Sequence, residues 1–332
     1  MRVINVRDAV GQKLCHDITK IVPGEFKGRL FKKGHIIKEE DIEELLSVGK
    51  DHIYIWNDEE DLVHENEAAE ILKEISAGCG LSFSEVKEGK IEFFADIDGL
   101  LKIDLDSLIK LNSIDEIILS TINNNKVVKK GDKVAATKVI PLAIKKEKLI
   151  EAANLIKEKI INIYPIKSKK VAIVTTGNEV YYGRIKDAFK EVIEKKLYPY
   201  NCEIIGQSIL PDDTEKIKES IEYWINNGAE MILCTGGMSV DADDLTPKAI
   251  KEVGAEIISY GTPIFPGAMF LISYKGDMPI LGLPGGVIFS KSTTFDVLLP
   301  RILAGEKLTK SDIVAYSHGG LCITNEYANN IY

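Results

Sequence analysis

The chain has 332 residues, of which 45% are hydrophobic and 28% are charged, and its formal net charge is −9 at pH 7. This composition supports ordinary hydrophobic cores and excludes a disordered chain, and the length is enough for two or three domains. The acidic balance argues against a nucleic-acid-binding protein, which would normally present a basic surface.

Cysteine and histidine usage points to an intracellular protein without a zinc site. The five cysteines are scattered without a CxxC pair, and the five histidines form no HExxH-type motif. The first ten residues, MRVINVRDAV, lack an apolar signal-peptide core, and no stretch reaches the roughly 18 uncharged apolar residues of a membrane span. We therefore expect a cytoplasmic protein that neither enters a membrane nor binds nucleic acid.

The first half of the chain favours mixed α and β structure. Apolar residues at helical spacing predict helices at 38–48, 65–76 and 145–160. β-branched runs between Gly, Asn and Asp turns predict strands at 52–56, 89–94, 100–103, 116–119, 127–128 and 134–144. We interpret residues 1–64 as an α+β support domain and residues 65–165 as a β-rich domain with helices.

From Lys170 onwards, short apolar runs alternate with amphipathic segments. The runs predict strands at 171–174, 202–205, 231–234, 255–260, 269–274 and 279–283. The amphipathic segments predict helices at 185–196, 214–227, 247–253 and 287–303. Such alternation predicts an α/β domain, a largely parallel sheet covered on both faces, which we place at 166–310 before a C-terminal tail at 311–332.

The most informative stretch is MILCTGGMSVDADDLTP at 231–247. A Gly pair directly after a strand leaves backbone N–H groups free to point at an anion, and ligands of α/β sheets lie beyond the carboxyl ends of the strands. The same loop carries three carboxylates, hard oxygen ligands of the kind that Mg²⁺ prefers: Asp241, Asp243 and Asp244. This combination indicates a nucleotide-like ligand and metal-assisted chemistry. The alternative is that Asp244 or Thr246 only caps the helix beginning at Pro247.

Three further loops follow predicted strands. Thr175-Thr176-Gly177-Asn178-Glu179 suits phosphate or ring recognition, although many β–turn–α units have such loops for structural reasons alone. Asp213 or Thr214 is expected to cap the next helix, which leaves Asp212 to face the ligand. The Gly285-Gly286 pair is either an anion site at a helix start or a tight turn that needs positive φ.

In this order the loops resemble one family. TTGNEV, GRIKDAF, DD, TGGMSVDADDLTP, PG and GLPGG are similar to motifs of the molybdopterin-binding domain found in molybdopterin adenylyltransferases, the gephyrin E domain and bacterial molybdopterin molybdotransferases. The resemblance covers residues 168–305. It implies a three-layer α/β/α, Mog-like fold. It also implies a homo-oligomer that inserts molybdate into adenylylated molybdopterin with Mg²⁺, releasing AMP, with a molybdoenzyme as the possible recipient of the cofactor.

The resemblance assigns roles by motif position. The residues expected on the pterin side are Thr176, Gly177, Asn178 and Glu179. Those expected to contact phosphate are Gly236, Gly237 and Ser239, with Pro284, Gly285 and Gly286 completing the cradle. Asp244 ranks first as a catalytic or metal-binding residue, Asp212 is the second catalytic candidate, and Asp241 is the other candidate metal ligand.

Several positions depart from the family pattern. The lysine that usually follows the Pro-Gly turn is replaced by Ala268, the usual LPGNP reads LPGGV, and no SxxDGYA segment occurs. These departures favour an alternative, a non-catalytic carrier or insertion chaperone of finished molybdenum cofactor. A further alternative is an enzyme like the related domain of the competence-damage family, which acts on a pyridine nucleotide or ADP-ribose.

Overall fold

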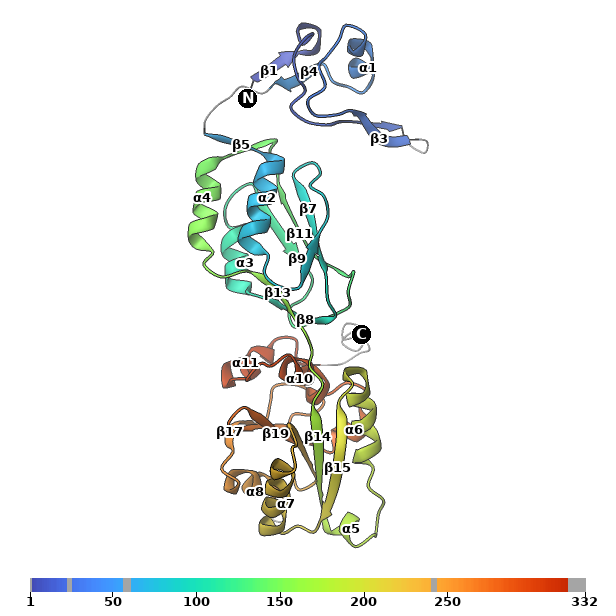
Figure 1. Cartoon of the computed structure of the whole chain (residues 1–332), viewed down its shortest axis with the longest axis vertical. Coiled ribbons are helices and arrows are strands. Elements are labelled where there is room, and N and C mark those ends of the chain that lie inside the picture. Colours follow the sequence, from blue (N-terminus) through green and yellow to red (C-terminus); the bar gives the residue numbers. More distant parts are fainter. Residues whose placement is uncertain (1, 23–25, 56–60, 240–243, 322–332) are drawn as a thin grey trace. The chain divides into compact units, whose positions relative to one another are not determined.

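The computed structural model describes residues 2–22, 26–55, 61–239 and 244–321 (Figure 1). Clustering of residues in space separates two units, the first made of 1–97, 102–124 and 130–163 and the second of 98–101, 125–129 and 164–332. The boundary drawn from the sequence at 64 and 65 stays a prediction. No helix in the described ranges is both long and apolar enough to cross a membrane.

The first 55 residues fold around a small core. Strand β1 (Arg2–Asn5) pairs with β4 (His52–Ile55), β2 (Ile18–Val22) forms an antiparallel hairpin with β3 (Phe26–Phe31), and α1 spans Asp41–Ser47. The helix predicted at 38–48 is confirmed but begins later, because the Asp41 carboxylate accepts the Lys38 N–H at 2.9 Å. The buried side chains of this core are Val6, Ala9, Leu14, Ile18, Ile37, Leu45 and Ile53.

The following segment is rich in antiparallel β-structure, as predicted. Its main sheet has the order β6 (Leu81–Phe83), β7 (Lys90–Ala95), β11 (Lys133–Val139) and β9 (Ile117–Thr121). Two smaller sheets are β10 (Val127–Val128), β8 (Gly99–Ile103) and β13 (Ile161–Tyr164), and β12 (Ala143–Lys145) with β5 (Leu62–His64). The helices are α2 (Glu65–Ser76), α3 (Leu105–Asn112) and α4 (Lys146–Leu155).

Two predictions for this segment were wrong in extent. The single strand expected at 134–144 is two strands in different sheets, because Pro141 has no N–H to continue a ladder. The helix expected at 145–160 ends at Leu155, since Ile156 adopts an extended backbone that leads into β13. The strand β13 was missed because its apolar residues continue the helical pattern.

The C-terminal unit is built on a six-stranded sheet. Its order is β15 (Glu203–Leu210), β14 (Lys170–Thr176), β16 (Met231–Thr235), β19 (Met278–Leu283), β18 (Leu271–Lys275) and β17 (Glu256–Tyr260). The first four strands are mutually parallel, whereas β18 is antiparallel to both of its neighbours. The largely parallel sheet expected from the sequence is therefore confirmed.

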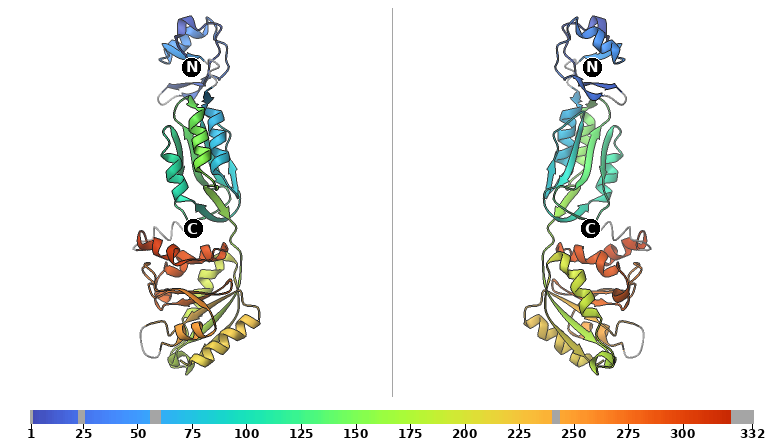
Figure 2. Two further views of the ribbon diagram at one scale, coloured as in Figure 1. Left: turned by 90° about the vertical axis from the view of Figure 1, so that its left-hand side faces the viewer. Right: turned by 90° about the vertical axis from the view of Figure 1, so that its right-hand side faces the viewer.

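Helices cover both faces of this sheet (Figures 1 and 2). Along β14, Val171 and Ile173 face one buried cluster and Ala172 and Val174 face the other. The first cluster is completed by α6 (Phe189–Leu197) and α10 (Thr294–Leu303), the second by α7 (Thr214–Asn226) and α8 (Thr246–Glu252). This alternation is the three-layer α/β/α arrangement that the sequence predicted.

Helix boundaries differ from the predictions near the loops. The helix predicted at 185–196 begins at Phe189 and follows a short helix, α5 (Asn178–Tyr181). The helix predicted at 287–303 is two helices, α9 (Gly286–Phe289) and α10. Residue Ser290 is extended, and Thr293 and Asp296 form a capping box that starts α10 anew.

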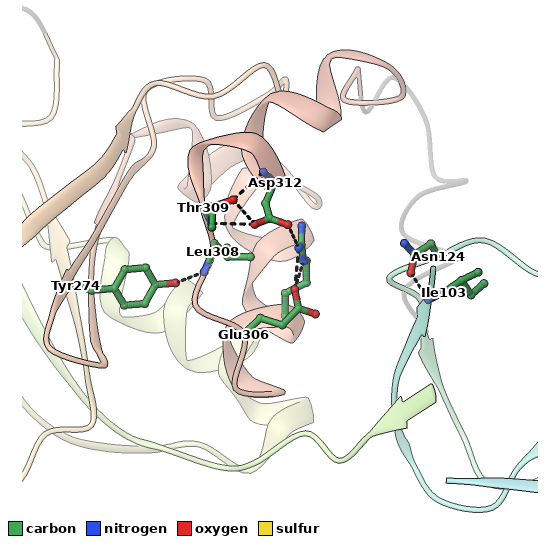
Figure 3. A network of polar contacts seen from close by, with 8 residues as sticks. Ile103, Asn124, Tyr274, Glu306, Leu308, Thr309 and Asp312 are labelled. Carbon is green, nitrogen blue, oxygen red and sulfur yellow. Dashed lines mark hydrogen bonds and ion pairs between the residues drawn. The ribbon is translucent and has the colours of Figure 1, made fainter. Parts of the chain in front are cut away.

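A buried arginine ties the last elements of the unit together. Arg301 bonds the carboxylates of Glu306 and Asp312, at 2.7 and 2.6 Å, and its side chain is 5% exposed. Thr309 is the N-cap residue of α11 (Lys310–Val314), and its N–H donates to the Asp312 carboxylate at 2.9 Å in a capping box. The Leu308 N–H donates to the Tyr274 hydroxyl at 3.0 Å (Figure 3). In the first unit, the Asn124 side chain accepts the Ile103 N–H (Figure 3).

Candidate functional site

The loops singled out in the sequence meet at one edge of the six-stranded sheet. In the parallel register, Thr176 lies opposite Leu210, Thr175 opposite Thr235, and Thr235 opposite Leu283. The segments after these strands therefore all leave the sheet on the carboxyl side, where α/β domains bind ligands. The predicted site residues that the structure brings to this edge are Thr176, Gly177, Asn178, Glu179, Asp212, Gly236, Gly237, Ser239, Pro284, Gly285 and Gly286.

The first two loops are linked through a carboxylate. The Asp212 carboxylate accepts the Asn178 N–H at 3.0 Å, so that side chain is turned toward the loop after β14. Its neighbour Asp213 caps α7 by accepting two backbone N–H groups, as expected. Gly177 has φ 136°, and a Cβ there would lie 2.9 Å from both carboxylate oxygens of Glu179. The backbone conformation therefore favours glycine here, whereas the Glu179 side chain could move aside for a Cβ.

The third loop needs both of its glycines. Gly236 and Gly237 have φ 82° and 54°, in the left-handed region. A Cβ on Gly236 would lie 2.0 Å from the Thr176 carbonyl oxygen, and one on Gly237 would lie 2.8 Å from the Thr246 hydroxyl. The Thr246 hydroxyl donates to the Gly236 carbonyl at 2.9 Å and bonds the Thr176 hydroxyl at 3.1 Å. These bonds fasten the loop to the carboxyl end of β14.

The backbone of this loop presents donors that the described fold does not use. Among the hydrogen bonds between described residues, none takes the N–H of Gly237, Met238 or Ser239 as its donor. Successive free N–H groups beyond a strand end form a concavity suited to an anion. Helix α8 begins at Thr246 with Leu245 as its N-cap residue, and the Thr246 hydroxyl bonds Gly236 and Thr176 instead of capping the helix. A capping role of Asp244 stays a prediction.

In the fourth loop, neither backbone conformation nor packing requires glycine at Gly285 or Gly286. Gly285 has φ −54° and ψ −27°, and Gly286 begins α9 with negative φ, so the interpretation as a turn with positive φ was wrong. A Cβ at either position would meet no atom within 4 Å. Open space above two adjacent glycines is what close approach of a ligand would require.

The predicted metal site is only partly visible. Asp241 and Asp243 lie outside the described residues, whereas Asp244 lies just before α8. Burial, and after it the negative charge of Asp244, raises the pKa of the Tyr260 hydroxyl. In the described ranges, no group of three or more His, Cys, Asp or Glu side chains is arranged to hold a metal ion.

Sequence reasoning missed a partly buried chain of polar contacts that links β14, β15 and β16. The Gln207 amide donates to the Thr175 hydroxyl at 2.9 Å and to the Asp187 carboxylate at 2.7 Å. The Thr235 hydroxyl donates to Thr175 at 3.0 Å. The chain thus joins three strands and the loop before α6. Only the paired threonines signalled it, because nothing in the sequence places Gln207 beside them.

The Pro-Gly turn before β18 is firmly held. The Phe265–Pro266 peptide is cis, and Gly267 has φ 107°. The Thr294 hydroxyl donates to the Gly267 carbonyl at 2.9 Å, and the Thr294 N–H donates to the carbonyl of Pro266. A side chain following this turn is therefore carried on an ordered backbone, and in this chain it is the methyl group of Ala268.

The comparisons with known proteins cover the same part of the chain. A family model described as "Probable molybdopterin binding domain" matches residues 172–304, and one described as a domain of unknown function matches residues 3–57. Residues 172–304 therefore belong to the probable molybdopterin binding family, as the sequence motifs suggested.

Similar proteins carry related names. A molybdopterin molybdenumtransferase of Synechococcus elongatus is 24% identical over 185 residues, 52% of this chain and 46% of that protein. A CinA-like protein of Thermosipho melanesiensis is 38% identical over 91 residues, 27% of this chain and 22% of that protein. The chain thus spans less than half the length of these curated relatives. A solved molybdopterin biosynthesis MoeA protein from Pyrococcus horikoshii aligns with 17% identity and a TM-score of 0.35, over 73% of this chain and 79% of that chain.

Proposed function

We propose that this protein binds molybdopterin at the carboxyl edge of its six-stranded sheet and takes part in inserting molybdate into adenylylated molybdopterin. The observation that carries the proposal is the Gly236–Gly237 loop. Its glycines have left-handed φ, and no described residue accepts the N–H groups of Gly237, Met238 and Ser239, an arrangement suited to an anion. The family of the domain supplies the ligand class. In keeping with this role, we infer a cytoplasmic homo-oligomer that passes its product to a molybdoenzyme.

The residues present fit an anionic ligand. The N–H groups of Gly237, Met238 and Ser239 would bind phosphate oxygens, and the bare backbone of Gly285 and Gly286 would let the ligand approach closely. The loop Thr176–Glu179 would line the pterin side, with its backbone fixed at Asn178 by the Asp212 carboxylate. In this arrangement Asp212 positions the first loop, and it stays the second catalytic candidate.

The donor set also fits Mg²⁺. This ion usually takes one or two protein carboxylates and completes its shell with waters and substrate phosphates, so a cluster of three side chains is not needed. Asp244 and Asp241 would hold it. When bound, it would neutralise charge at the phosphoanhydride that separates molybdopterin from AMP. Without a bound cation, the Asp244 carboxylate would repel the ligand phosphates, so we expect ligand binding to depend on Mg²⁺.

One observation favours a second candidate function. The ordered turn at Gly267 carries Ala268 in place of a lysine, so the edge lacks a cation there that would attract molybdate. A carrier of finished molybdenum cofactor would not require that charge. The CinA-like relatives supply a third candidate, an enzyme acting on a pyridine nucleotide or ADP-ribose.

A single titration series separates these candidates. Purified protein is mixed with molybdopterin or adenylylated molybdopterin, with and without Mg²⁺ and molybdate, and both binding and AMP release are measured. Molybdate-dependent AMP release supports insertion, and tight binding without release supports the carrier. Binding of NAD or ADP-ribose in preference to both pterins would reject the proposal.

The variant Asp244→Asn tests the metal assignment in the same assay. The amide keeps the shape of the side chain but loses the charge that would hold Mg²⁺. We expect Mg²⁺-dependent AMP release to fall at least tenfold, about 1.4 kcal/mol in the barrier, with an unchanged thermal midpoint. Full activity would remove Asp244 from the metal site.

A further inference from the structure

Tyr260, on the edge strand β17, is hydrogen-bonded to the loop that follows β16. Tyr260 is the last residue of β17, and its hydroxyl lies 3.0 Å from the carbonyl oxygens of both Met238 and Ser239. Strand β17 is three positions away from β16 in the sheet order. Because β17 and β19 are both antiparallel to β18, the end of β17 lies at the same edge as the candidate site.

The loop after β16 reaches Tyr260 by crossing the end of β19. The Met238 side chain is buried, and a Cβ on Gly282 of β19 would lie 2.4 Å from its Cε. The absence of a side chain at Gly282 thus leaves room for the Met238 side chain to lie across this strand. The loop is fixed at one end by Thr246 and Thr176, in its middle by Met238, and at the other end by the Tyr260 hydroxyl.

The direction of the two carbonyl groups determines where the loop presents its donors. A trans peptide is planar, so its C=O and N–H point in opposite directions. When the Met238 carbonyl accepts from Tyr260, the Ser239 N–H must point away from Tyr260. This N–H is one of the donors that no described residue uses. Without the tie, the peptide between Met238 and Ser239 would be free to rotate.

We propose that Tyr260 is a positioning residue for anion binding, because its hydroxyl holds the peptide of Met238 and Ser239 in the orientation that aims an N–H group at the ligand phosphate. This inference rests on the proposed function for the nature of the ligand, but not for the binding of an anion.

The test compares two tyrosine-to-phenylalanine variants of the full chain by calorimetric titration with inorganic pyrophosphate, and in parallel with adenylylated molybdopterin. Tyr260→Phe removes only the hydroxyl. Tyr274→Phe is the matched control, because the Tyr274 hydroxyl also holds a backbone group, the Leu308 N–H, away from the site. We expect Tyr260→Phe to weaken pyrophosphate binding about five- to tenfold and Tyr274→Phe to leave it unchanged.

Hydrogen–deuterium exchange supplies a second readout. Saturating pyrophosphate should slow exchange of the peptide covering 236–239 in the wild type, because its N–H groups then donate to the ligand, and should slow it less in Tyr260→Phe. Unchanged pyrophosphate affinity in Tyr260→Phe, whatever its exchange, overturns the inference, as does a wild type that binds no pyrophosphate. If the wild type binds pyrophosphate but not the pterin, the proposed function is rejected. The role of Tyr260 in anion binding is then tested by pyrophosphate affinity alone.

Discussion

Alanine at Gly285 should separate binding from folding. The backbone there has φ −54° and ψ −27°, which any L-residue adopts, and an added Cβ would meet no atom within 4 Å. The free energy of unfolding should therefore be unchanged or rise by up to about 1 kcal/mol, because alanine loses less entropy on folding than glycine. The methyl group would instead occupy the space through which the ligand approaches.

The matched substitution is Gly236→Ala. Its φ of 82° is left-handed, and the new Cβ would lie 2.0 Å from a main-chain oxygen that cannot rotate away. We expect a loss of about 1–2 kcal/mol from the conformation and of about 1–3 kcal/mol from overpacking. Both variants therefore lose ligand affinity, but only Gly236→Ala loses stability.

Urea unfolding and calorimetric titration with adenylylated molybdopterin provide the two measurements. For Gly285→Ala we expect an affinity at least tenfold lower, about 1.4 kcal/mol, at unchanged or higher stability. An affinity equal to that of the wild type would show that the loop 284–286 does not line the site. A destabilised Gly285→Ala would show that the open space above this residue is absent in solution.

Two further predictions concern stability. Arg301→Leu should lower the free energy of unfolding by about 3 kcal/mol, because it leaves the carboxylates of Glu306 and Asp312 without their buried partner. Urea unfolding should show a lower midpoint, and an unchanged midpoint would contradict the prediction. His64 accepts the Asn66 N–H at Nδ1, which leaves the proton on Nε2, and burial lowers its pKa. Below about pH 6.5 the unfolded chain therefore binds a proton at His64 that the folded chain does not bind. The free energy of unfolding should fall as the pH drops through this range. His64→Gln should flatten that fall in urea unfolding at pH 7.5 and 5.5, and an unaltered pH slope would refute the role of His64.

Local sequence determined the elements of the C-terminal domain well. Strands such as Met231–Thr235 are short apolar runs, and α7 has an apolar stripe directly after its capping residue, Asp213. Residues close together in the sequence therefore determine both the buried face and the start of such an element. The predicted element boundaries were wrong where a polar hydrogen bond interrupts an element that the spacing of apolar residues alone would continue. The capping box of Thr293 and Asp296 interrupts a helix that the apolar pattern alone would continue.

The sequence also placed the candidate loops after predicted strands of a largely parallel sheet, whose carboxyl ends are where ligands bind. It did not reveal which polar side chains the loops use to hold one another. Asp212 reaches Asn178 across 34 positions in sequence, and Thr176 reaches Thr246 across 70. Such pairs depend on strand order, which hydrophobic periodicity does not encode.

Glycine shows the same division between sequence and structure. The motifs mark Gly236, Gly237, Gly285 and Gly286 alike, because composition cannot distinguish a glycine needed for its backbone from one needed for open space. Only the tertiary structure separates them, through left-handed φ and a crowded Cβ at the first pair and neither at the second. The tie from Tyr260 to Met238 likewise arises only when β17 is placed at the sheet edge. The residue types of the candidate site come from the sequence, whereas the direction in which its donors point is decided by strand order and packing.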